Sequence, residues 1–242
     1  MGRDDINYWS VMDKNFKIKV TKDGPYIVSG GVPIIEESIE EDAEGYSKDW
    51  KLEGKLKPVS TDYLLCRCGK SKNMPFCDQT HMNIKFDGTE KKEIDFEECA
   101  ETLTGPNVDL KDCYDLCASA RFCDRAGTIW DLVEKDDPGA TKIAIEEAEK
   151  CSSGRLVIVD KKTGEPIEKK LDPCISATID LPAGVLGPLW VKGGIPIESA
   201  DGKEYAERNR VTLCRCGKSK NMPFCDSTHI EEVVHDHEHE DS

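Results

Sequence analysis

Two stretches of the chain combine cysteine and histidine at a spacing that suits metal binding. Residues 66–81 read CRCGKSKNMPFCDQTH, and residues 214–229 repeat this sequence at 15 of 16 positions. Three thiolates and one imidazole that meet at one point suit a zinc ion or an iron–sulfur cluster. The repeat therefore predicts two metal centres of one kind, with the ligands Cys66, Cys68, Cys77 and His81 in the first copy and Cys214, Cys216, Cys225 and His229 in the second.

The elements around each copy must bring the four ligands together. Cys77 and His81 are four residues apart, so on a helix they would share one face. Upstream of each copy, residues 24–34 and 187–197 both read as a short strand, a Gly-Gly turn and a second strand that begins at proline. The first copy is longer, and its excess falls in the acidic and polar residues 36–57, which we expect to form a surface loop.

The repeated motif resembles the CDGSH iron–sulfur family, whose pattern is Cys-x-Cys-x-x-Ser/Thr-x-x-x-Pro-x-Cys-Asp-Gly-Ser/Ala/Thr-His. Gln79 and Ser227 stand where the family usually has glycine. The resemblance implies a [2Fe-2S] cluster in each copy, held by three cysteines and one histidine that can take up a proton on reduction. Zinc on the same four ligands is the alternative. The residues that match beyond the ligands are Ser71, Pro75, Asp78 and Thr80, and Ser219, Pro223, Asp226 and Thr228.

Six further cysteines lie between the two copies. Cys117 and Cys123 precede a predicted helix over residues 141–150, and Cys151 follows it. This segment resembles the divergent mono-cluster ferredoxin family, with its early Cys-x5-Cys and a late cysteine. Three cysteines suit a [3Fe-4S] cluster, or a [4Fe-4S] cluster with a fourth ligand from elsewhere. Cys113 is the first candidate for that ligand, before Cys99 and Cys174, and a segment without any cluster is the alternative.

The composition limits the class of protein. The chain has 242 residues, twelve cysteines and a net charge of −15. The acidic balance argues against a general nucleic-acid binder, and no apolar run is long enough to span a membrane. The first residues lack the apolar core of a signal peptide, so we expect a cytoplasmic protein whose thiols stay reduced. The acidic tail, residues 231–242, contains His235, His237 and His239 and is expected to be solvated.

These observations predict an α+β fold in which two small β-rich CDGSH-type units pack as a pseudo-dimer within one chain. The expected units are residues 1–94, a ferredoxin-like α+β segment over 95–180, residues 181–230 and the tail. We expect a redox protein that transfers electrons or donates clusters or iron to partner proteins, and not an enzyme. The protein is expected to be a monomer. The alternative is an interaction module that zinc stabilises without redox activity.

Overall fold

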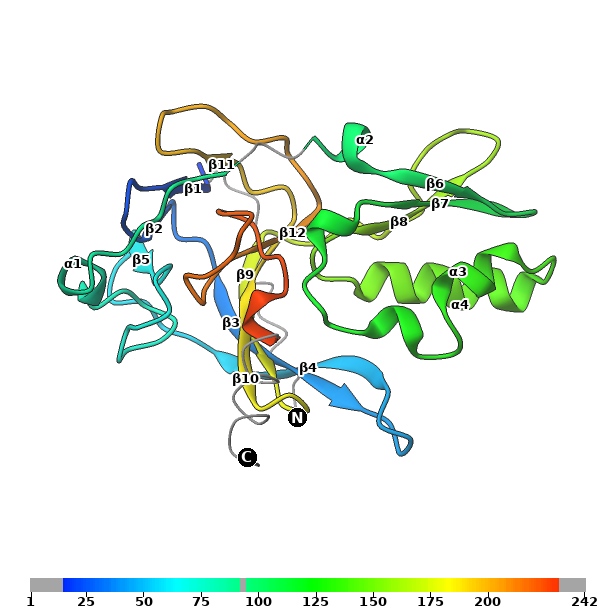
Figure 1. The fold of residues 1–242 in the computed structure, drawn as a ribbon, viewed down its shortest axis with the longest axis horizontal. Coiled ribbons are helices and arrows are strands. Elements are labelled where there is room, and N and C mark those ends of the chain that lie inside the picture. Colours follow the sequence, from blue (N-terminus) through cyan, green and yellow to red (C-terminus); the bar gives the residue numbers. More distant parts are fainter. Residues whose placement is uncertain (1–14, 92–94, 231–242) are drawn as a thin grey trace, which may run out of the picture.

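The computed structural model describes residues 15–91 and 95–230 of the chain. Within these ranges the fold is α+β, as the sequence predicts, with three β-sheets and a few short helices. Most strands of the two end segments lie on one side of the molecule, whereas helices α3 (Ile129–Glu134) and α4 (Pro138–Lys150) lie on the other (Figure 1). None of the helices in the described ranges has the length and hydrophobicity that a membrane crossing requires. The histidines of the tail lie outside the described residues.

A four-stranded sheet combines strands from both ends of the chain. Strand β1 pairs with β2 in antiparallel orientation, and on its other side it runs parallel to β11, with Ile18 opposite Ile197. Alternate side chains such as Ile18 and Val20 of β1 are buried, as the two-residue period of a strand requires. The strands, in spatial order, are β11 (Ile197–Glu198), β1 (Lys17–Val20), β2 (Tyr26–Ser29) and β5 (Tyr63–Leu65).

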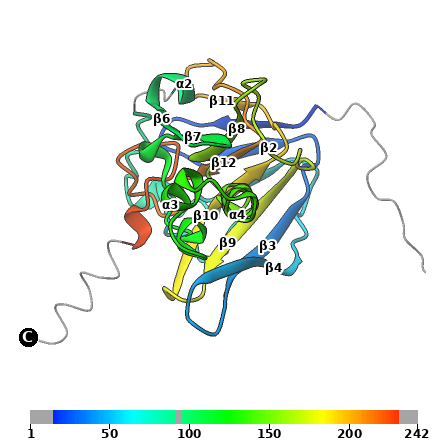
Figure 2. The ribbon, with the colours of Figure 1, turned by 90° about the vertical axis from the view of Figure 1, so that its right-hand side faces the viewer.

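A five-stranded sheet also draws on both ends. Strands β3 and β9 lie side by side in Figure 2 and are parallel, with Ile34 opposite Ile175. Strand β9 pairs with β10 on one side and with β3 on the other, so by its pairing it belongs to the C-terminal end segment and not to the middle segment. Each end segment therefore contributes strands to both sheets. The spatial order is β12 (Arg210–Leu213), β10 (Val185–Lys192), β9 (Cys174–Asp180), β3 (Ile34–Glu41) and β4 (Ser47–Lys55).

The expectation of a surface loop over residues 36–57 is wrong, because this stretch forms most of β3 and all of β4. An antiparallel strand at a sheet edge can leave one face in water, so a high charge content is compatible with pairing. Trp50 anchors the edge strand. Its ring lies 5.1 Å from the ring of Phe122 and 5.2 Å from that of Trp190, between centroids, and its Nε1 donates to Lys150 O at 3.0 Å.

One hydrophobic core is common to the two end segments. It contains buried side chains of strands β1, β2 and β5 together with those of β9, β10 and β12. Tyr26 is fully buried in it, and its hydroxyl donates to Cys214 O at 2.8 Å and to Pro223 O at 3.1 Å. A strand of the first end segment therefore helps to fix the metal-binding loop of the second.

The middle segment has a sheet and a core of its own. Strand β8 (Leu156–Asp160), whose residues form an apolar run, pairs with β7 (Val108–Asp112), and β7 pairs with β6 (Glu101–Thr104). Helices α3 and α4 cover this sheet through Ile129, Leu132 and Ala144.

Helix α4 is longer than the predicted 141–150. It begins at Pro138, because the side chain of Asp137 accepts hydrogen bonds from the backbone N–H groups of Gly139 and Ala140, and proline fits the first helical position.

Candidate metal centres

The N-terminal ligand set lies where β5 ends and the following loop folds back on it. The N–H of Cys66 donates to Pro75 O at 2.7 Å, so the arms of the loop pair like a short antiparallel ladder. This pairing gathers the donor atoms in two pairs. Cys66 Sγ lies 3.8 Å from Cys68 Sγ, and Cys77 Sγ lies 3.5 Å from His81 Nδ1.

The C-terminal set is built in the same way after β12. The N–H of Cys214 donates to Pro223 O at 2.8 Å. Cys214 Sγ lies 3.6 Å from Cys216 Sγ, and Cys225 Sγ lies 3.6 Å from His229 Nδ1. The eight residues predicted as ligands are therefore brought together in four pairs.

The remaining motif residues shape the two loops. Ser71 Oγ donates to Phe76 O at 2.6 Å, and Asp78 accepts the N–H of Lys72 at 2.8 Å and that of Thr80 at 3.0 Å. These bonds lower the pKa of Asp78 to about 2, because they favour the charged carboxylate. Equivalent bonds join Ser219 to Phe224 and Asp226 to Lys220 and Thr228.

Cys77 and His81 do not lie on one face of a common helix, although their spacing predicts it. Helix α1 (Thr80–Asn83) begins after Cys77, and Gln79 precedes it with a φ of 70°. Ser227 has a φ of 67° in the second copy. Both residues occupy the left-handed region, where glycine carries no steric penalty, which explains why the family pattern has glycine there.

The pair distances suit two ligands of one metal. In a tetrahedral site with metal–sulfur bonds of about 2.3 Å and metal–nitrogen bonds of about 2.0 Å, two sulfurs lie about 3.8 Å apart and a sulfur and a nitrogen about 3.5 Å apart. The observed separations are 3.5 to 3.8 Å. Over residues 15–91 and 95–230, no three or more His, Cys, Asp and Glu side chains are grouped so that they could hold one metal ion.

Hydrogen bonds and burial act in opposite directions on the thiols. The pKa of Cys214 is lowered to about 6, because its sulfur accepts a hydrogen bond from Cys216 and further bonds from backbone N–H groups of the loop. Burial raises the pKa of Cys68 to about 11 and also raises that of Cys77. Metal binding requires thiolates, so the amide donors around Cys214 prepare this position for a ligand role.

The two sets differ in their surroundings despite their nearly identical sequence. Cys225 is 3% exposed and His229 is 8% exposed, whereas Cys77 and His81 are only half-buried. Burial lowers the pKa of His229 to about 4, because desolvation disfavours the imidazolium. Distant parts of the chain, and not the motif itself, create this difference.

The motif arginines have a structural role that the sequence did not reveal. Arg67 and Arg215 are buried, and their guanidinium groups donate to backbone carbonyls. Arg67 contacts Thr21 O and Gly88 O, and Arg215 donates to Gly187 O at 2.9 Å.

The two metal-binding loops touch each other. A Cβ placed on Gly69 would lie 2.1 Å from Cys216 O, and one on Gly217 would lie 2.5 Å from Cys68 O. Only glycine permits this approach of the two backbones, so each loop needs its glycine to accommodate a ligand residue of the other loop.

The middle segment also brings its expected ligands together. Cys117, Cys123 and Cys151 line one small pocket with Ser153 and Arg155. Cys117 directly follows the turn η1 (Tyr114–Leu116), Cys123 lies within the turn η2 (Phe122–Asp124), and Cys151 follows α4. Burial raises the pKa of Cys123, with a smaller contribution from its acidic neighbour Asp124.

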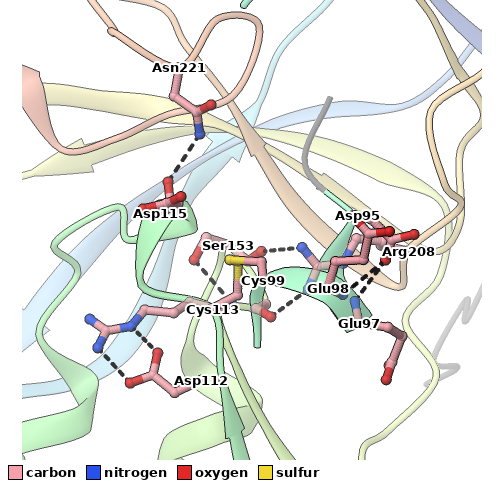
Figure 3. Close-up of a disulfide and its surroundings, with 12 residues drawn as sticks. Asp95, Glu97, Glu98, Cys99, Asp112, Cys113, Asp115, Ser153, Arg208 and Asn221 are labelled. Carbon is pink, nitrogen blue, oxygen red and sulfur yellow. Dashed lines mark hydrogen bonds and ion pairs between the residues drawn. A yellow bond between two sulfur atoms is a disulfide. The ribbon is translucent and has the colours of Figure 1, made fainter. Parts of the chain in front are cut away.

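Cys113, the first candidate for a fourth ligand of the middle set, is disulfide-bonded to Cys99 in this structure. The antiparallel register of β6 and β7 pairs Glu101 with Asp112 and thereby brings the two cysteines together. Figure 3 shows the bond beside the turn that carries Asp115. Cys113 is therefore not a free ligand here, and the expectation that every thiol is reduced does not hold for this pair. The other ten cysteines are free.

Cys174 lies away from the middle set. It is buried in β9, where its thiol donates to Ile175 O at 3.5 Å, and burial raises its pKa to about 11. It behaves as a buried core cysteine in this position.

Comparison with known proteins agrees with this geometry. A model of the iron-binding zinc finger CDGSH type matches residues 23–82 and 186–230, which include both ligand sets. A model of the divergent 4Fe-4S mono-cluster family matches residues 103–161, which include Cys117, Cys123 and Cys151. No curated protein and no solved structure matches the chain.

The matched families bind iron–sulfur clusters, and their matches cover all three sets of free cysteines described above. The chain therefore carries two regions of the CDGSH iron-binding family, separated by a region of the divergent 4Fe-4S mono-cluster family.

Proposed function

We propose that the chain holds two [2Fe-2S] clusters and a third cluster in the middle segment, and that it transfers electrons or donates clusters or iron. The observation that carries the proposal is the pairing of donor atoms in both copies. Each copy offers a thiol–thiol pair and a thiol–imidazole pair at the separation of two ligands on one iron. Two such pairs are what a two-iron centre requires.

The clusters, when bound, supply one-electron chemistry. The chain supplies the thiolates and the environment. Nδ1 of His81 faces Cys77, and Nδ1 of His229 faces Cys225, so Nε2 is the ring nitrogen left to carry a proton in each case. A histidine in place of a fourth cysteine raises the reduction potential, as it does in Rieske centres.

The third centre is proposed on Cys117, Cys123 and Cys151. The pocket that they line favours a [3Fe-4S] cluster, or a [4Fe-4S] cluster whose fourth ligand is not Cys113 while the disulfide is intact.

The two end units are proposed to form a pseudo-dimer within the chain. Their strands share two sheets and one core, and each metal-binding loop packs against a ligand residue of the other. A small unit with one metal site gains stability when its apolar face is buried by a twin, so we expect the protein to be a monomer in solution.

The proposed role is not enzymatic, and the partners are redox proteins or cluster acceptors. A compartment that keeps the ten free thiols reduced suits this role, which favours the cytoplasm. The same ligands would also accept zinc, in which case the metals would only stabilise the fold.

Metal and sulfide analysis of matched variants tests the proposal. Wild-type protein prepared without oxygen should contain about seven irons per chain, or about eight with a four-iron middle cluster. The paired substitution Cys66→Ala with Cys77→Ala should remove about two irons, and so should Cys214→Ala with Cys225→Ala. Cys117→Ala with Cys151→Ala should remove the remainder. Zinc without sulfide in the wild-type protein would refute the redox function.

A further inference from the structure

The repeated motif provides a comparison within one molecule. The two ligand sets have nearly the same sequence and the same internal hydrogen bonds, yet their thiol–imidazole pairs lie in different surroundings. Any difference in how they exchange metal must therefore come from the parts of the chain that cover them.

The thiol–imidazole pair of the N-terminal set is open to solvent. Cys77 and His81 are half-buried, and helix α1 has no buried residue. Met82 and Ile84, which follow the histidine, are 69% and 46% exposed. Among the described residues, no other segment buries the side chains of Cys77 and His81.

The corresponding C-terminal pair is enclosed. Cys225 and His229 are 3% and 8% exposed, and the neighbouring Met222 is 4% exposed. The thiol–thiol pairs show no such enclosure of the C-terminal set, since Cys216 of that set is half-buried whereas Cys68 of the N-terminal set is 6% exposed. The contrast between the sets therefore concerns the thiol–imidazole pairs.

Several parts of the chain enclose the C-terminal pair, and the middle segment is one of them. Ala118, Ala120 and Ser152 line a small cavity together with His229. Nδ2 of Asn221 donates to Asp115 O at 3.0 Å, a contact drawn in Figure 3.

The loop that contains Ala118 and Ala120 covers His229, and an ion pair holds this cover in place next to the histidine. Arg121, in the loop between the first two cysteines of the middle set, makes a bidentate contact with Asp180 at 2.7 and 2.9 Å. Asp180 is 3% exposed and lines the same cavity as His229. The Arg121 side chain is 36% exposed and the Asp180 side chain 4%. A bidentate arginine–carboxylate pair with one buried partner holds two segments together more firmly than a fully exposed pair does.

We propose that the N-terminal set is the site that exchanges iron with acceptors outside the chain, whereas the C-terminal set retains its iron beneath the middle segment. This inference rests on the proposed function, since it requires iron in both sets. Exchange involves no change of oxidation state. The bonds from the metal to its ligands break, the donor atoms of the acceptor replace them, and the freed thiolates and sulfides take up protons from water.

The test follows individual thiols in the loaded wild-type protein. EDTA removes iron without oxygen while N-ethylmaleimide labels each thiol as it becomes free. After a quench, an isotopically distinct maleimide labels the remaining thiols in denaturant, and mass spectrometry compares the peptides that contain Cys77 and Cys225. We expect Cys77 to be labelled at least about tenfold faster, because access to Cys225 requires local opening of its cover.

Two arginine variants test the cover itself. Arg121→Ala should raise the labelling rate of Cys225 several-fold and leave that of Cys77 unchanged. Arg125→Ala is the matched control, because this arginine pairs with Glu146 inside the middle segment. It should change neither rate by more than about twofold.

The outcomes separate this inference from the proposed function. Equal labelling of Cys77 and Cys225 in a protein with full iron content, or faster labelling of Cys225, would overturn the inference alone. An unchanged Cys225 rate in a folded Arg121→Ala variant would overturn the assignment of the cover to this ion pair. A protein that takes up neither iron nor sulfide would overturn the proposed function and the exchange together.

Discussion

Replacement of Gly69 by alanine tests the contact between the two metal-binding loops. The new Cβ would lie 2.1 Å from Cys216 O and 2.6 Å from the carbonyl carbon, so the backbone of one loop must move away from the other. The substitution has a second cost, because Gly69 has a φ of 72°, where alanine is disfavoured by about 1–2 kcal/mol. The two costs must be separated before the contact can be weighed.

Gly164 provides that separation. Its φ is 74°, and a Cβ there would meet no atom within 4 Å. Gly164→Ala therefore carries the backbone cost of Gly69→Ala without the clash. The difference between the variants isolates the overpacking between the loops, which we expect to be about 2 kcal/mol. For a chain of this length, that corresponds to a melting temperature about 4–8 °C lower for Gly69→Ala than for Gly164→Ala.

Unfolding followed by circular dichroism, with both variants prepared without oxygen, measures this difference. Iron analysis of the same samples adds a second readout, because displacement of Cys216 should reduce iron in the C-terminal set, although the substitution lies in the N-terminal loop. If the two variants unfold within about 0.5 kcal/mol of each other, the loops do not pack as described and the pseudo-dimer is refuted.

Three further predictions follow from the local geometry. Gln79→Gly and Ser227→Gly should each stabilise the protein by about 0.5–1 kcal/mol in denaturant unfolding. Glycine removes the strain of the left-handed backbone, but part of this gain is lost because glycine has more conformational entropy in the unfolded chain. Destabilisation by either variant would contradict the left-handed backbone at these positions. His81→Cys with His229→Cys should lower both reduction potentials, measured by redox titration. Between about pH 6 and 8 the substitutions should flatten the pH dependence of the N-terminal centre, whereas burial lowers the pKa of His229 to about 4 and takes it out of this window; a wild-type N-terminal potential that is independent of pH would exclude the proton coupling. Burial raises the pKa of Glu147 from 4.5 to about 7, so the folded state holds the proton more tightly and stability should fall as pH rises through this window. Glu147→Gln should remove that fall in unfolding measured across the window, and an unchanged slope would refute the assignment.

The sequence predicts the ligands well because metal chemistry restricts both residue type and spacing. The repeat identifies Cys66 and Cys214 as equivalent before any fold is known. Cys117, Cys123 and Cys151 are also brought together as the family resemblance implies.

Properties that depend on distant contacts could not be predicted in this way. Two copies that match at 15 of 16 positions carry no signal that His229 is enclosed and His81 is not, because the enclosure comes from residues outside the motif, including Ala118 and Ser152 of the middle segment. The disulfide of Cys113 depends on the register of β6 and β7, and the charged strand β4 depends on the packing of Trp50. Local patterns contain none of this tertiary information.

Metal analysis of the variant with Cys117→Ala and Cys151→Ala, in which only the two end sets remain, tests most directly whether the paired ligands hold two-iron clusters. Iron, acid-labile sulfide and zinc are measured on the full chain prepared without oxygen. Two [2Fe-2S] centres predict about four irons and about four sulfides per chain, with no stoichiometric zinc. About two zinc ions per chain without sulfide would contradict the assignment of iron–sulfur clusters, because the paired ligands would then hold single metal ions with no redox chemistry.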